Sequence, residues 1–285
     1  MCECPLTIGS RTLAYKRPFL DILAEPLVRV FARSCFMPFN RLLLDLAYRL
    51  NGFGTWYPDK AGLPTGETKA MARLLQRIEP HVVFDVGANR GDFAKHVRSL
   101  CPDAEVRCFE PQPRAFAALE EIATDYSLIA ENVALSKAKG SMTLYDQKGA
   151  GFSTTASLNK AAVEAFSSDI EAFEVDVTSV DTYCQKHGLT KIDLLKIDTE
   201  GYDLNVLKGA TTMLSAGNIS AVSFEFIPAN LKTHVFFYEI LDELKGFDVF
   251  RILPGGSLYK IEDYTYRYCE IFVPSSYIAL KKTQS

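Results

Sequence analysis

No stretch of the 285-residue sequence approaches the roughly 20 uninterrupted apolar residues that a membrane-spanning helix needs. The first residues, which include Glu3 and Pro5, are not followed by the apolar run of a secretory signal peptide. These two absences predict a protein that is soluble or at most peripheral to a membrane, and the expected location is the cytoplasm.

Cysteine pairs with zinc-ligand spacing are missing as well. The chain has seven cysteines, and only Cys2 and Cys4 lie close together. No second pair completes a zinc site, and a disulfide framework is not expected in so long a chain. We therefore expect reduced thiols, which suit a cytoplasmic protein, and no metal site.

The chain also lacks the excess of positive charge that binding to nucleic-acid phosphates requires. The formal net charge is −4 at pH 7, which argues against a nucleic-acid partner. Residues 1–50 are the exception. Their seven Lys/Arg against four Asp/Glu give a charge of +3, so the remainder of the chain carries −7.

Residues 1–66 are predicted to be a helical extension and linker, and residues 67–285 the main domain. Two sets of apolar residues recur at helical spacing, and Pro26 and Pro38 are expected to break them into short helices: Leu20, Leu23, Leu27 and Phe31, then Leu42, Leu43, Leu46 and Leu50. Two interpretations of this basic, amphipathic segment stay open. It lies on an anionic membrane surface, or its apolar stripe packs on the main domain or on a second subunit of a homo-oligomer.

Beyond the linker, predicted strands and helices alternate, which favours an α/β fold with a mostly parallel sheet and helices on both faces. Core strands are expected at 82–86, 105–110, within 127–135, and at 192–198, 221–226, 247–253 and 269–273. Helices are expected at 92–100, 113–124, 203–214 and 235–245, and hairpin strands at 141–146 and 173–177. The last strand follows its neighbour without a crossover helix, so it should run antiparallel.

A glycine turn, Asp85-Val86-Gly87-Ala88-Asn89-Arg90-Gly91, follows the first core strand. In open α/β sheets, ligands bind at this end of the strands. Gly87 lets a ligand approach the backbone, and a helix that starts near Gly91 offers unpaired N–H groups. The turn lacks the second glycine of the dinucleotide fingerprint G-x-G-x-x-G, because Asn89 stands there.

The acids beside this turn discriminate between cofactors. The Asp85 carboxylate would repel a pyrophosphate, whereas it suits the cationic amino-acid part of S-adenosylmethionine, directly or through water. Glu110, at the end of the second strand, is expected to accept hydrogen bonds from ribose hydroxyls. The sequence therefore predicts S-adenosylmethionine as the cofactor in preference to NAD.

The same residues resemble the FkbM-type methyltransferases, a class I S-adenosylmethionine-dependent family acting largely as O-methyltransferases. The resemblance spans roughly residues 80–226, and its matching segments are 84–91, 109–113, 132–135, 180–183, 196–201 and 206–209. It implies a Rossmann-like, seven-stranded sheet with an antiparallel last strand. It also implies that the cofactor contacts Asp85, Gly87, Asn89, Gly91, Glu110, Pro111, Asn132 and Asp198. Tyr202 and Asp203 depart from the family pattern, in which a small residue and Glu are common.

Methylation of an alcohol needs a general base within hydrogen-bond reach of the hydroxyl. Asp198 is the first candidate, and Glu200, Glu225 and His234 are the others. One of the acids accepts the proton, or the group binds a cation that acidifies the hydroxyl. Alternatively, Asp198 only positions the cofactor and Glu200 caps the following helix. The Asn/Asp-Pro-Pro-aromatic motif of amino-methyltransferases is absent after this strand.

These observations predict an O-methyltransferase whose acceptor is a hydroxyl of a glycan, a glycolipid or a secondary metabolite. The breadth of acceptors comes from the family and not from a residue of this chain. An NAD(P)-dependent oxidoreductase and a non-catalytic module that binds the cofactor or anchors an assembly at a membrane are the alternatives. The hydroxyl-rich segment 152–157 either covers the acceptor or is a polar surface loop.

Overall fold

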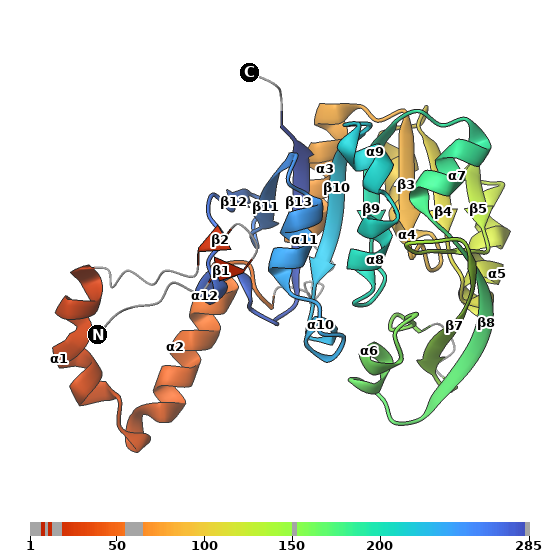
Figure 1. Cartoon of the computed structure of the whole chain (residues 1–285). Helices are drawn as coiled ribbons and strands as arrows, with labels where there is room; N and C mark the ends of the chain where they lie inside the picture. Colours follow the sequence, from red (N-terminus) through yellow and green to blue (C-terminus); the bar gives the residue numbers. More distant parts are fainter. Residues whose placement is uncertain (1–6, 9–10, 13–18, 55–64, 150–152, 283–285) are drawn as a thin grey trace.

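The computed structural model describes residues 7–8, 11–12, 19–54, 65–149 and 153–282. These residues build an eight-stranded sheet with the order β12-β11-β13-β10-β9-β3-β4-β5 (Figure 1). The strands are β3 (Val82–Val86), β4 (Glu105–Phe109), β5 (Leu128–Glu131), β9 (Ile192–Ile197), β10 (Ile219–Phe226), β11 (Phe247–Ile252), β12 (Leu258–Lys260) and β13 (Ser275–Lys281).

The predicted α/β fold is confirmed. Strands β5, β4, β3, β9 and β10 are parallel, and β13 runs antiparallel between β10 and β11. Seven of the strands form the predicted class I methyltransferase sheet. The eighth, β12, is a short antiparallel addition beside β11 that the sequence did not indicate.

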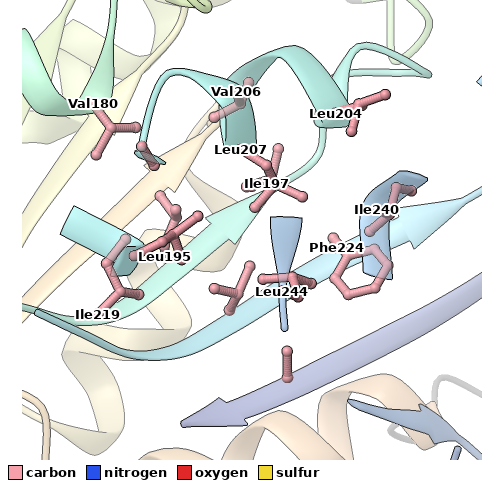
Figure 2. Packing of buried hydrophobic residues seen from close by; sticks show 14 of the residues in the cluster. Val180, Leu195, Ile197, Leu204, Val206, Leu207, Ile219, Phe224, Ile240 and Leu244 are labelled. Carbon is pink, nitrogen blue, oxygen red and sulfur yellow. The ribbon is translucent and has the colours of Figure 1, made fainter. Parts of the chain in front are cut away.

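Helices cover both faces of the sheet (Figure 1). One face carries α3 (Gly66–Ile78), α4 (Asp92–Leu100) and α5 (Pro113–Ala123), and the other carries α7 (Val180–His187), α8 (Asp203–Lys208), α9 (Thr211–Ser215) and α11 (Phe237–Glu243). Alternate strand residues feed the two cores, because successive side chains point to opposite faces. Leu195 belongs to the core that includes residues of α7, α8, α9 and α11 (Figure 2), whereas Leu194 belongs to the core on the side of α3, α4 and α5.

A three-stranded sheet is inserted between β5 and β9. It consists of β6 (Ala134–Leu135), β7 (Gly140–Gln147) and β8 (Ile170–Thr178), and α6 (Lys160–Glu164) lies between the two long strands. Strands β7 and β8 pair antiparallel over their whole length, from Gly140 opposite Val177 to Gln147 opposite Ile170. The predicted hairpin is therefore confirmed, with strands longer than expected.

Two predicted elements of the main domain are wrong in detail. Residues 269–273 are not the last strand, because the helix α12 (Tyr266–Cys269) ends there and β13 begins at Ser275. Strand β13 has neighbours on both edges and is buried on both faces. Its sequence therefore lacks the alternation of apolar and polar residues that marks a half-buried strand. The helix expected at 203–214 is divided into α8 and α9 near Gly209, where an added Cβ would lie 2.0 Å from the Ser136 carbonyl oxygen.

The N-terminal residues form a short ladder, β1 (Thr7–Ile8) and β2 (Arg11–Thr12), and a helical hairpin, α1 (Phe19–Phe31) and α2 (Met37–Leu50), which extends away from the sheet (Figure 1). Pro38 lies in the first turn of α2, as a helix break there requires, but α1 continues through Pro26, so the break predicted at Pro26 is wrong. The hairpin joins the main domain at Phe53, whose side chain is buried. The guanidinium carbon of Arg251 lies over the Phe53 ring, 4.0 Å from the ring centroid.

The apolar stripe of this hairpin does not pack on the main domain in the described residues, so that predicted alternative is wrong for them. Its large side chains are exposed, from 39% at Phe31 to 68% at Leu50. Within the described ranges, we find no helix whose length and apolar content would let it cross a bilayer.

Candidate active site

The glycine turn brings the ends of β3 and β9 into direct contact. Gly87 has a φ of 75°, and a Cβ built on it would lie 1.9 Å from the carbonyl oxygen of Asp198. Its N–H donates to the Phe109 carbonyl at the end of β4 (2.9 Å). Gly91, with a φ of 76°, is the N-cap of α4. The turn therefore needs glycine for both conformation and space, as predicted from the sequence.

Asp85 is completely buried and faces Lys196, a residue that sequence reasoning did not single out. The Lys196 Nζ lies 3.0 Å from Asp85 Oδ1, 3.2 Å from Asp198 Oδ2 and 3.4 Å from the Gly87 carbonyl oxygen. Asp85 is not among the described residues that line the cavity next to the turn. Its carboxylate thus holds Lys196, and Lys196 in turn orients Asp198. A direct contact of Asp85 with the cofactor stays a prediction.

Glu110 is buried beneath the turn, and its carboxylate ties two segments together. Oε2 accepts the backbone N–H of Asn89 (2.7 Å), and Oε1 accepts that of Gln112 (2.8 Å). Burial raises the pKa of Glu110 to about 7, against the opposing effect of these two hydrogen bonds. Each oxygen retains acceptor capacity for a ligand hydroxyl, as the predicted ribose contact requires.

A cavity of about 270 Å³ opens above these strand ends. The residues that line it fall into three groups: the turns after β3 and β4 (Gly87, Asn89, Glu110, Pro111), the segment after β9 (Asp198, Thr199, Glu200, Tyr202), and the inserted sheet with its loop (Leu135, Leu144, Ser153, Ser157, Leu158). Pro111 and the three leucines provide apolar surface that suits a flat aromatic base. The acids that also line the cavity suit polar and cationic groups.

The loop of the inserted sheet closes one side of this cavity. The Asn89 side chain donates to the Ser153 carbonyl (2.9 Å), and the Ser157 hydroxyl donates to the Thr199 carbonyl (3.3 Å). Ser153, Thr154, Ala156 and Ser157 therefore line the cavity, so this loop is more than a part of the outer surface, and a contact with the acceptor stays a prediction. Phe152 lies outside the described residues. Asn89, expected as a cofactor contact, also ties the glycine turn to this cover.

Asp198 and Glu200 reach the cavity from the segment after β9. The Asp198 side chain is 33% exposed, whereas Glu200 is buried and has a φ of 52°. Burial, reinforced by the nearby Asp198, raises the pKa of Glu200 well above its usual range. Glu200 does not cap α8, because the N-cap residue Tyr202 has no side-chain cap. Instead, Asp203 accepts hydrogen bonds from both the N–H and the hydroxyl of Thr199.

Five predicted residues are not among the described residues that line the cavity: Asp85 and Gly91, whose surroundings are given above, and Asn132, Glu225 and His234. Asn132 donates to the Glu110 carbonyl (2.9 Å) and supports the second turn from outside. Glu225 lies at the end of β10, where its N–H donates to Asp203 (3.2 Å). His234 follows α10 (Ala229–Lys232) in a left-handed conformation, and its side chain is exposed. The structure therefore brings Asp198 and Glu200 to the cavity and leaves Glu225 and His234 outside it.

The sequence pattern of the Methyltransferase FkbM domain matches residues 85–268, from the buried aspartate of β3 to α12. The chain belongs to the FkbM methyltransferase family. It is an S-adenosylmethionine-dependent methyltransferase, as predicted. The cavity along the Gly87 turn lies at the carboxyl ends of the parallel strands, the end at which open α/β sheets bind ligands, and the contacts of individual residues with the cofactor stay predictions. The interpretation as a nicotinamide-dependent oxidoreductase is wrong.

Two relatives whose activities are known match more than half of the length of this FkbM methyltransferase. The 2-O-methyltransferase NoeI of Sinorhizobium fredii is 26% identical over 75% of this chain and 91% of its own length. The hexuronic acid methyltransferase AglP of Haloferax volcanii is 28% identical over 55% of this chain and 62% of its own. A solved FkbM methyltransferase of Methylobacillus flagellatus overlaps 70% of this chain and 44% of its own, with 12% identity and a TM-score of 0.44.

Proposed function

We propose that this FkbM methyltransferase methylates a hydroxyl group of a glycan, a glycolipid or a secondary metabolite. The observation that carries the proposal is the placement of Asp198, whose partly exposed carboxylate lines the cofactor cavity while Lys196 holds it at 3.2 Å. A carboxylate at that point can accept a hydroxyl proton. NoeI is a 2-O-methyltransferase and AglP a hexuronic acid methyltransferase, and their activities support this class of acceptor.

The chemistry transfers one methyl group and releases one proton. The acceptor oxygen forms a bond to the methyl carbon, the carbon–sulfur bond breaks, and the sulfur leaves as a neutral thioether. Asp198 takes the hydroxyl proton, and Lys196 stabilises the Asp198 carboxylate before the transfer. Glu200, whose pKa is raised by burial and by Asp198, is protonated more readily and is suited to donating a hydrogen bond to an acceptor oxygen.

The test is methyl transfer from labelled S-adenosylmethionine to a panel of glycans, glycolipids and hydroxylated metabolites. The Asp198→Asn variant should lose at least about 100-fold in turnover, as expected on removal of a general base, while it still binds S-adenosylhomocysteine. Asp242→Asn, at a partly exposed aspartate of α11, is the matched control. Full turnover by Asp198→Asn would show that Asp198 is not the base.

We further propose that the α1–α2 hairpin lies on an anionic membrane surface. The exposed apolar side chains are Leu27, Val28, Val30, Phe31, Met37, Phe39, Leu42, Leu43, Leu44, Leu46 and Leu50. Four arginines accompany them against two acids, Glu25 and Asp45, among the side chains described at 24–50. Residues 51–285 carry a net charge of −7. A layer of anionic headgroups has a higher density of negative charge and therefore attracts the arginines of the hairpin more strongly.

Vesicle co-sedimentation tests this contact. Full-length protein should bind vesicles that contain phosphatidylserine more strongly than vesicles of phosphatidylcholine alone, and Leu42→Glu with Leu46→Glu should abolish the binding. Leu258→Glu, on the exposed edge strand β12, is the matched control. A stable dimer that loses its association through the same double substitution, without vesicle binding, would identify a second copy as the occupant instead.

The cysteines support a reducing compartment such as the cytoplasm. Cys108 and Cys184 are buried, Cys35 is exposed, and no disulfide joins the cysteines of the described ranges. Burial raises the pKa of Cys184 to about 11, so this thiol is unreactive. Thiol titration of protein purified without reductant should find these groups reduced.

A further inference from the structure

A second cavity lies beside the cofactor cavity, between the beginnings of α3 and α4. Its volume is about 340 Å³, and it is lined by Glu67 and Met71 of α3, by Phe93 and His96 of α4, and by Lys196 of β9. Asp92, the first residue of α4, lines both cavities. The two spaces therefore adjoin where the glycine turn ends.

The charges around Lys196 are unbalanced. Three carboxylates are close to this one ammonium group: Asp85 at 3.0 Å, Asp198 at 3.2 Å, and Glu67, which lines the same cavity. Burial and the charge of Asp198 raise the pKa of Glu67, and Lys196 offsets this only in part. A cationic group bound in this cavity would lower the pKa of Glu67 again and so favour its ionised form, which accepts hydrogen bonds.

The Glu67 side chain is held in place by the sheet. Its Oε2 accepts a hydrogen bond from the hydroxyl of Ser276 on β13 (3.3 Å). On the opposite helix, the His96 Nε2 is buried and has no hydrogen-bond partner among the described residues. The cavity thus combines a carboxylate that lacks a full counter-charge with a ring nitrogen that lacks a partner. These two groups are complementary to the ammonium and the carboxylate of an α-amino acid.

We propose that this second cavity holds the amino-acid end of S-adenosylmethionine, and that Glu67 accepts hydrogen bonds from its ammonium group. The inference rests on S-adenosylmethionine as the cofactor and goes beyond it by naming the partner of the ammonium. Asp85, the residue expected from the sequence, is less suited to this contact because it is completely buried and lines neither cavity. Glu67 takes that role, with His96 facing the carboxylate end.

Three ligands test the proposal by calorimetry. S-adenosylhomocysteine carries the whole amino-acid end, its des-amino analogue lacks only the ammonium, and 5′-methylthioadenosine lacks the amino-acid end altogether. Glu67→Gln should weaken binding of S-adenosylhomocysteine about 10- to 100-fold, the usual loss when a hydrogen bond to a charged group is removed. Binding of the other two ligands should change less than about twofold. Glu120→Gln, an exposed glutamate on α5, is the matched control for the same chemical change.

The outcomes separate this proposal from the cofactor assignment. If Glu67→Gln leaves the affinity for S-adenosylhomocysteine unchanged, or weakens all three ligands equally, Glu67 does not bind the ammonium. If the variant does not fold, the wild-type protein still decides, because equal affinities for S-adenosylhomocysteine and its des-amino analogue would overturn the proposal. Wild-type protein that binds none of the three ligands would overturn the cofactor assignment itself.

Discussion

Replacement of Lys196 by methionine tests how the Asp85 carboxylate is kept charged inside the protein. Lys196 is 13% exposed and Asp85 is not exposed at all, so the substitution leaves a buried carboxylate without its counter-ion. Breaking such a pair costs about 3–5 kcal/mol. The variant can avoid an unpaired buried charge by protonating Asp85, so the cost of protonation sets an upper limit to the loss of stability. For an aspartate with the ordinary pKa of about 3.9, protonation costs about 4 kcal/mol at pH 7 and about 1.5 kcal/mol at pH 5.

Urea unfolding of wild type and Lys196→Met at both pH values measures this effect. The free energy of unfolding should fall by about 3–4 kcal/mol at pH 7 and by about half as much or less at pH 5. Adding Asp85→Asn to Lys196→Met should restore most of the loss, because the unpaired charge is gone. Lys160→Met, which breaks an exposed pair with Glu164, should change stability by less than about 1 kcal/mol. A loss that is independent of pH, or that Asp85→Asn does not relieve, would refute this reasoning.

Gly87→Ala should destabilise the protein by more than about 2 kcal/mol, because the left-handed conformation costs about 1–2 kcal/mol and the new Cβ meets the Asp198 carbonyl. Gly149→Ala, which has a φ of 72° but nothing within 4 Å, isolates the conformational part, and equal melting shifts would contradict the steric argument. Burial raises the pKa of Glu110 to about 7, and the ionised carboxylate accepts hydrogen bonds from ribose hydroxyls more strongly than the protonated acid does. Affinity for S-adenosylhomocysteine should therefore decrease as pH falls below about 7, and Glu110→Gln should abolish this dependence in calorimetric titrations. The same raised pKa means that the contribution of Glu110 to stability, present at low pH, is lost as pH rises through about 7 in the unliganded protein.

The sequence was sufficient to predict the sheet and the cofactor turn because both depend on local patterns. Gly87 and Gly91 occur where a strand meets a helix, and the alternation of elements determines a parallel sheet. The last strand was misplaced because β13 is buried on both faces, so its apolar run has no period to identify it. The apolar residues at 269–273 then appeared to be the better strand.

Roles that depend on distant residues could not be predicted. The sequence predicts a cofactor contact for Asp85 from its place before Gly87, but the ion pair of Asp85 with Lys196 on the neighbouring strand was not predicted. The spacing of the charged residues could have identified Lys196. If β3 and β9 are paired as parallel strands, Lys196 lies opposite Asp85. Because Lys196 and Asp198 are two residues apart, their side chains point to the same face of the sheet. Glu67 gave no signal at all, because only the packing of α3 beside β13 brings it to the site.

The position of β13 affects how the chain folds. This strand comes after β11 in the sequence, yet it lies between β10 and β11 in the sheet. Until residues 275–281 are synthesised, β10 has an unpaired edge and β11 has no neighbour through which to join the parallel strands. An unpaired edge of this kind invites pairing with other chains. The glycine turn and its parallel strands can therefore assemble before β13 joins the sheet, whereas the hydrogen bond from Ser276 to Glu67 forms only afterwards.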